Sequence, residues 1–174
     1  MPVLSYVLSL LGLAAMIAAS LTRGEKMKLI LLLVFFGNVL VATSYLADGS
    51  GISGAVTCYL GAVQVLINYF FQSKGRDIPK WLLAIYAVSF VALNIWAARG
   101  ISPEVALVSV ASLSFIMGIV QKTGAKYRFW TVINVLLWIT YDVWTGAYGA
   151  LITHVTIFVF TVVGMILHDR KKKA

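Results

Sequence analysis

The sequence predicts an all-α integral membrane protein with seven transmembrane helices, and three observations lead to that fold class. The 174 residues are 61% hydrophobic and only 11% charged, whereas a soluble domain carries roughly 25% charged residues. The charges fall in short clusters between apolar stretches of about twenty residues, the length that crosses roughly 30 Å of hydrocarbon. The chain also resembles itself at a separation of about 96 residues, which indicates an internal repeat.

Seven apolar segments follow one another along the chain. They span residues 3–21, 28–47, 53–72, 80–98, 103–120, 128–145 and 148–168. The first segment lacks a basic n-region and a small-residue cleavage site, so we expect a retained helix. Turn-forming Gly, Ser and Pro residues and charged residues separate the later segments. Fusing the fourth and fifth segments would bury the charged stretch 99–104, so seven helices are favoured over six.

The basic residues predict which side of the membrane each connection faces. Thirteen of the 14 Lys and Arg residues lie in the first, third and fifth connections and in the C-terminal tail, and Arg99 is the exception. Because cytoplasmic connections retain Lys and Arg, the N-terminus is predicted outside and the C-terminus in the cytoplasm. No nucleic-acid partner is expected, because its binding residues would gather on one folded face or arm.

The internal repeat predicts two like units. Asn38 and Tyr45, seven residues apart, return as Asn134 and Tyr141 with the same spacing. Gly-containing outer turns follow both copies, at 51–55 and 146–150. Chance similarity between apolar helices is the alternative.

A 3+1+3 plan within a single membrane domain, 1–174, follows from this repeat. The first three-helix repeat is 1–72, the linker helix 73–102, and the second repeat, with its basic cytoplasmic tail, 103–174. Because three is an odd number, the linker helix gives the second unit the same orientation as the first. Transporters built from such repeats place their substrate site near the midplane, between the units.

Aromatic and polar residues form a stripe on the sixth predicted helix. Asn134, Trp138 and Tyr141 recur at helical spacing, and Asp142 lies beside them. The stripe offers a flat aromatic surface next to hydrogen-bonding groups, so we expect it to contact a bound solute. The alternative is that the aromatic residues lie at a headgroup boundary, which is the better explanation for the Trp residues nearer the helix ends.

A second polar stripe lies on the third predicted helix. Gln64 and Asn68 share one face of that helix. Together with Asn38 and Tyr45 of the second helix, they complete the residues that we expect around a small solute. The same amides could equally form interhelical hydrogen bonds, typically worth about 1 kcal/mol, so both interpretations stay open.

Asp142 and His154 lie on consecutive helices, on either side of an outer turn. We therefore expect them to approach one another and His154 to join the solute site. An Asp and a His inside a membrane are also candidates for a proton relay, because His titrates near neutral pH. A hydrogen-bonded structural role for His154 is the favoured alternative, and proton coupling is kept as a hypothesis.

Motifs for catalysis or metal binding are absent from the sequence. It contains no Gly-x-Ser-x-Gly elbow, phosphate-binding loop, His-Glu-x-x-His pair or cysteine cluster. His154 and His168 have no partner at metal-ligand spacing, and Cys58 has no second cysteine with which to form a disulfide. We expect no enzyme activity, no catalytic residues, no cofactor and no metal.

The aromatic pattern of the sixth helix also carries a family resemblance. The stretch 127–130 and the spacing Trp138-x-x-Tyr141-x-x-Trp144-x-Gly146 resemble the bacterial inner-membrane YgjV-like family. The likeness extends over most of the chain and implies a multi-pass protein of the bacterial cytoplasmic (inner) membrane. The 3+1+3 plan is similar to SWEET-type sugar facilitators and PnuC-type vitamin transporters, but such an analogy of fold does not fix function. The sequence lacks the Pro-Gln hinge of SWEET-type proteins.

These observations predict a transporter or facilitator for a small polar metabolite, such as a sugar, a nucleoside or a vitamin precursor. It would work by alternating access between the two repeats. A non-transporting membrane protein, such as a sensor, scaffold or assembly factor, is the alternative. The expected partners are the lipid bilayer, the small polar solute and, because the bundle is thin, a second copy of the chain in a homo-oligomer.

Overall fold

The computed structural model describes residues 2–48, 52–146 and 148–169. This part of the chain folds into seven helices and contains no strand: α1 (Pro2–Leu21), α2 (Met27–Asp48), α3 (Ile52–Ser73), α4 (Lys80–Ala98), α5 (Pro103–Ile119), α6 (Gly124–Thr145) and α7 (Tyr148–His168). The predicted all-α fold class is therefore confirmed. The basic tail at 170–173 and parts of the matching outer turns, at Gly51 and Ala147, lie outside the described residues.

Four of the described helices are long and apolar enough to cross a membrane. They are α1, α2, α3 and α7, with spans at Val3–Leu21, Met27–Ala47, Ala55–Ser73 and Ala150–His168. The apolar stretches of α4 and α5 are shorter, and α6 carries Lys126, Arg128 and Asp142 within its length. A crossing by all seven helices stays a prediction for α4, α5 and α6.

The start of α6 differs from the prediction. The helix begins at Gly124 and not at residue 128, because the Thr123 side chain accepts a hydrogen bond from the backbone N–H of Lys126 and caps the helix. Lys126 and Arg128, which were counted among the basic residues of the fifth connection, therefore belong to the first turns of α6, just as Lys28 and Lys80 belong to the first turns of α2 and α4. Basic residues are unfavourable near a helix N-terminus, so the sequence predicted a loop at this stretch.

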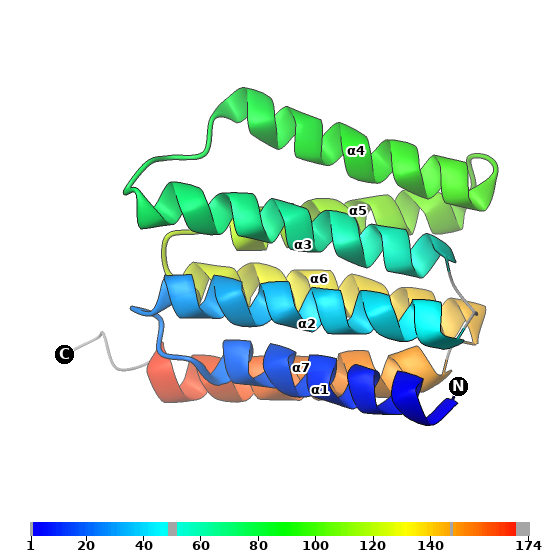
Figure 1. Ribbon diagram of the computed structural model, residues 1–174, viewed down its shortest axis with the longest axis horizontal. Helices are drawn as coiled ribbons and strands as arrows, with labels where there is room; N and C mark the ends of the chain where they lie inside the picture. Colours follow the sequence, from blue (N-terminus) through cyan, green and yellow to red (C-terminus); the bar gives the residue numbers. More distant parts are fainter. Residues whose placement is uncertain (1, 49–51, 147, 170–174) are drawn as a thin grey trace.

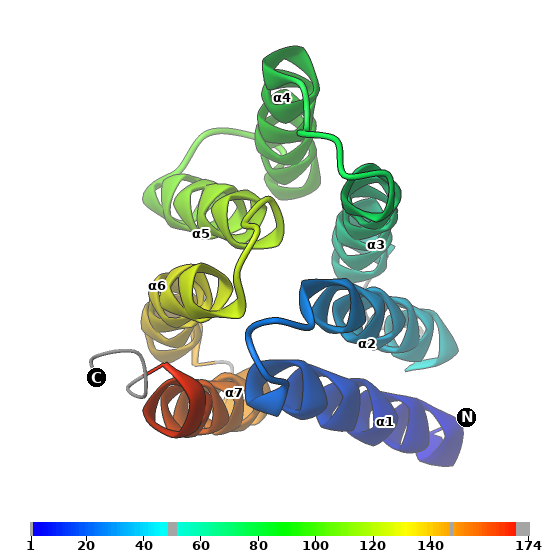
Figure 2. The same cartoon turned by 90° about the vertical axis from the view of Figure 1, so that its left-hand side faces the viewer.

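The helices form a closed ring. Each helix packs against the next one in the chain, and α1 also packs against α7. In the end-on view of Figure 2, α1, α2 and α3 form one row that faces α5, α6 and α7, with α4 at one edge. We call these rows the N-triple (α1–α3) and the C-triple (α5–α7). Their equivalence as repeats, and the division of the chain at residues 72 and 102, stay predictions.

The helices run alternately between two ends of the bundle (Figure 1). At one end α1, α3 and α5 finish and α2, α4 and α6 begin. We call this the basic end, because Arg23, Lys74, Lys122 and their basic neighbours lie in its connections. The other end is called the far end.

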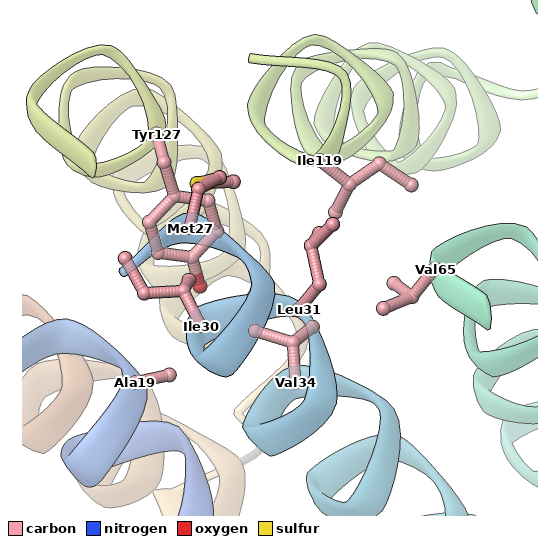
Figure 3. Packing of buried hydrophobic residues seen from close by; sticks show 8 residues of the cluster. All are labelled: Ala19, Met27, Ile30, Leu31, Val34, Val65, Ile119 and Tyr127. Carbon is pink, nitrogen blue, oxygen red and sulfur yellow. The ribbon is translucent and has the colours of Figure 1, made fainter. Parts of the chain in front are cut away.

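A core of apolar side chains fills the ring toward the basic end (Figure 3). Its buried members come from both triples: Ala19, Met27, Ile30, Leu31, Val34, Val65, Ile119 and Tyr127. Lipid tails are as apolar as these side chains, so close packing and not exclusion from water favours the association of helices in a membrane. The core thus holds α1, α2, α3, α5 and α6 together at one depth.

Arg128 connects three helices at the basic end, although its side chain is fully buried. Its Nε and Nη2 atoms donate to the two carboxylate oxygens of Asp169, at 3.0 and 2.5 Å. Its Nη1 atom donates to the backbone oxygens of Thr22, at 2.8 Å, and Ser20, at 3.5 Å. The last carbonyls of a helix lack partners within the helix and attract cations. Arg128 therefore joins the end of α1 to α6 and to the residue after α7.

Other hydrogen bonds between the triples lie in the same half of the bundle. They pair His168 with the Leu21 oxygen, Ser20 with Thr161, Gly124 with the Gly24 oxygen, Asn68 with the Ile119 oxygen, and Gln72 with the Gln121 oxygen. The basic end is therefore a joined region in which both triples contribute donors and acceptors.

Two glycines permit this close approach of the triples. A Cβ on Gly164 of α7 would clash with the backbone oxygen of Ser20 in α1. A Cβ on Gly124 of α6 would clash with the Cα of Gly24. Small residues let helix backbones come together in this way inside membranes.

We expect Gly164→Ala to destabilise the protein, although Ala favours an isolated helix by about 1 kcal/mol. The added methyl group forces α1 and α7 apart, and overpacking of this kind costs about 1–3 kcal/mol. Thermal unfolding of the purified protein in detergent measures the effect. Gly100→Ala is the control, because a Cβ there meets nothing within 4 Å. An unchanged melting temperature for Gly164→Ala would contradict the packing described for α1 and α7.

Candidate functional site

The predicted site residues divide between two places in the ring. Gln64 and Asn68 lie on α3, where that helix faces α4 and α5. Asp142 and His154, with the aromatic residues around them, lie on α6 and α7 toward the far end. We call the first place the amide site and the second the Asp–His site.

The amide site is built on one face of α3. Gly61, Gln64 and Asn68 recur at i, i+3 and i+7, so they share that face. A Cβ on Gly61 would lie 3.5 Å from the Oδ1 atom of Asn38 on α2 and 3.4 Å from the ring of Phe115 on α5. The face therefore meets both triples, as expected for a site between them.

Asn68 is part of the packing at this face. Its Nδ2 atom donates to the backbone oxygen of Ile119 on α5, at 3.3 Å. Its Oδ1 atom accepts from the Tyr86 hydroxyl of α4, at 3.2 Å. The side chain is fully buried, so the interpretation of Asn68 as an interhelical hydrogen-bonding residue is favoured by its contacts.

Gln64 differs from Asn68 although both are buried. Its side chain is 1% exposed, and neither Nε2 nor Oε1 has a hydrogen-bond partner among the described residues. The Tyr86 hydroxyl, which also donates to Asn68, lies 3.5 Å from the backbone oxygen of Gln64 and not at its side-chain amide. A buried amide without partners costs roughly 1–3 kcal/mol. Such a group inside a native fold therefore calls for an explanation beyond stability.

The two Asn residues of the predicted repeat lie at a similar depth. Asn38 donates to the Val34 oxygen of its own helix, at 2.9 Å, while its Oδ1 atom is near Gly61. Asn134 donates to the backbone oxygen of Ala111 on α5, at 2.7 Å. Ala111 lies one turn, about 5.4 Å, from Phe115, the residue beside Gly61. The amides of α2, α3 and α6 thus occupy one level of the bundle.

The Asp–His site brings four predicted residues together. The Nδ1 atom of His154 lies 2.6 Å from the Oδ2 atom of Asp142, which is 1% exposed. The Trp138 and His154 rings stack, with centroids 5.6 Å apart and planes 15° apart. Tyr141 meets Trp138 edge to face. The predicted approach of Asp142 and His154 is therefore confirmed, whereas a role in binding solute stays a prediction.

Tyr45 belongs to α2 of the N-triple, and its part in a solute site stays a prediction. Its surface is 37% exposed. A buried carboxylate is costly unless a partner satisfies it, and the donor from His154 meets that need. The stacked Trp138 ring holds the imidazole in place.

The described part of the chain contains no cluster of metal-binding side chains. No group of three His, Cys, Asp or Glu residues there could hold a metal ion. Cys58 carries a free thiol and is partly buried.

The sequence interpretation missed three residues that shape this region. Arg128 was counted among the basic residues of a connection. Its position near the basic end of α6, and that of Asp169 directly after α7, indicated that the two could form an ion pair. Tyr86 and Phe115 had no such signal, because an aromatic residue in an apolar helix looks like any other core residue. Their importance comes from contacts with Asn68 and Gly61.

Comparison with known protein families finds a match over almost the whole chain. The family model Imp-YgjV, described as bacterial inner membrane protein, matches residues 3–172. No curated protein and no solved structure matches the chain. The matched range includes the amide site, the Asp–His site and the residues that form hydrogen bonds between the two triples.

We expect removal of the His154 imidazole to destabilise the fold, because it leaves the Asp142 carboxylate buried without its partner. His154→Ala should cost roughly 3–5 kcal/mol, measured by chemical or thermal unfolding in detergent. Ile152→Ala, at an exposed position two residues earlier on α7, is the control.

Coupling between the two side chains is the sharper measurement. In the double variant Asp142→Asn with His154→Ala, the loss should be clearly smaller than the sum of the two single losses. Additive losses would mean that the two side chains do not stabilise one another.

Proposed function

Since the chain belongs to the Imp-YgjV family of bacterial inner membrane proteins, we propose that it is a transporter or facilitator for a small polar metabolite. The solute binds inside the ring, at the amide site between the N-triple and the C-triple. Repeat-built transporters place their sites near the midplane in this way. The protein works as a carrier and not as an enzyme.

The unpartnered amide of Gln64 is the observation that carries this proposal. Polar side chains inside a membrane are costly and usually face a functional interior. Gln64 lies in the middle part of α3, on the face that meets Asn38 and Phe115 from the two triples. A passing solute supplies the donor and acceptor that the protein does not supply.

Alternating access follows from how the triples are joined. Hydrogen bonds around Arg128 and Gln72 hold the triples together at the basic end. We propose that this end closes while the amide site opens toward the far end, and that breaking these bonds opens the basic end in turn. The linker helix α4 lets the two triples move without separating.

A non-transporting role as sensor, scaffold or assembly factor is the second candidate. Interhelical hydrogen bonds made by Asn68, Asn94 and Asn134 favour it, because they show amides used for packing. The two candidates differ in whether water reaches Gln64.

We expect a cysteine at position 64 to react with a small charged thiol reagent such as a sulfonate-bearing methanethiosulfonate. In a Cys58→Ser background, Gln64→Cys should be modified at least roughly tenfold faster than Val63→Cys, because only a hydrated thiol ionises and reacts. Val63 is the matched control, since it lies on the same helix but is 54% exposed on the outer surface. Mass spectrometry of the protein in liposomes measures both rates.

Equal, slow modification of the two cysteines would favour the non-transporting candidate. Protection of Gln64→Cys by one solute from a panel of sugars, nucleosides and vitamin precursors would identify what the protein carries. Uptake of that solute into proteoliposomes then completes the test.

We also propose that the basic end faces the cytoplasm, with the N-terminus outside. Cytoplasmic connections retain Lys and Arg, and the basic end holds most of these residues. In a Cys58→Ser background, an impermeant maleimide should label Ile101→Cys, which is 86% exposed at the far end, in cells with a permeable outer membrane. Lys74→Cys should react only after the inner membrane is opened. Labelling of Lys74→Cys in sealed cells would reverse the orientation.

A further inference from the structure

The amide of Gln64 indicates the chemical class of the solute. We propose that Gln64 binds the cis-amide edge of an uncharged, flat molecule, in which an N–H donor lies next to a carbonyl acceptor, as in a lactam ring. This inference rests on the proposed function and specifies the substrate of the same site.

The geometry of a glutamine side chain sets the first part of the inference. Its amide is planar and presents one acceptor and two donors side by side. The group that satisfies both kinds of atom at once is another donor–acceptor edge in the same plane, which gives two parallel hydrogen bonds. Glutamine and asparagine use this bidentate pairing when they bind the edge of adenine.

The absence of charge follows from the described surroundings of Gln64. The residues on its face, Gly61 and Asn68, and those that meet this face, Asn38, Tyr86 and Phe115, are all uncharged. A charged solute would be buried here without a counter-ion, at a cost of several kcal/mol. Asp142 already has a partner in His154 and lies in the other site.

The shape of the solute follows from Gly61 and Phe115. Gly61 lies one turn from Gln64 and has no side chain, and the edge of the Phe115 ring and the Oδ1 atom of Asn38 pack against it. Phe90 meets Phe115 edge to face, with centroids 6.2 Å apart, and fixes that orientation. A flat ring can enter between these groups once the triples separate, whereas a bulky, chair-shaped molecule meets both Phe115 and Asn38.

The test uses three probes on the purified full chain in detergent. These are 2-pyridone, uracil and N-methyl-2-pyridone, the last of which keeps the ring and carbonyl but lacks the N–H. Calorimetry or thermal shift should detect binding of 2-pyridone and uracil, and the N-methyl compound should bind at least about tenfold more weakly. Glucose, a chair-shaped molecule without an amide edge, is the negative control for binding.

The variant Gln64→Met separates binding from folding. It keeps the length of the side chain and removes the unpartnered amide, so its melting temperature should stay equal or rise. Its affinity for 2-pyridone should fall at least about tenfold. Asn94→Leu, away from this face, should leave the affinity unchanged.

Three results would overturn the inference: no binding of either lactam at millimolar concentration, equal binding of the N-methylated probe, or normal binding by Gln64→Met. Transport of another solute with any of these results would leave the proposed function standing. In the labelling experiment, equal and slow modification of Gln64→Cys and Val63→Cys would instead count against the proposed function itself.

Discussion

The burial of a guanidinium group at one end of the ring is the constraint on which the rest of the structure depends. Arg128 cannot lose its charge, so every donor must find an acceptor as it leaves water. The acceptors come from Asp169 and from the last carbonyls of α1. These acceptors belong to both triples, so the hydrogen bonds of Arg128 close the ring between α1, α6 and the end of α7. The glycine contacts of Gly164 and Gly124 are the steric condition for that closure.

The arrangement of polar residues inside the ring follows from this joined end. Asn68 and Gln72, on the last turns of α3, meet backbone oxygens of the C-triple and extend the joined region. One turn further from the basic end, Gln64 has no such partner among the described residues. Along this one helix face the amides change from paired to unpaired at Gln64, so the hydrogen bonds that pack α3 against the C-triple end there. The Asp–His site lies apart from it and satisfies its own charge.

Much of the fold could be predicted because the length and polarity of each segment reflect its surroundings directly. Six helices begin and end within one residue of their predicted limits. The start of α6 was missed because the basic residues Lys126 and Arg128 are typical of a loop. Only the structure shows that Asp169 and the α1 carbonyls pair with Arg128 inside the bundle. Helical spacing placed Gln64 and Asn68 on one face but could not distinguish them, because Tyr86 and Ile119 decide which amide is paired. The approach of Asp142 and His154 was predictable, since a short turn leaves two consecutive helices side by side.

The distance along the chain between the partners at the joined end has a consequence for biosynthesis. Arg128 and Thr22 are separated by 106 residues, and His168 and Leu21 by 147. The last carbonyls of α1 therefore have no partners from α6 and α7 until those helices have been synthesised. Such non-local contacts form late and slowly. The ring can therefore close only after the last helix has been made, and until then the polar groups at its basic end lack their partners from α6 and α7.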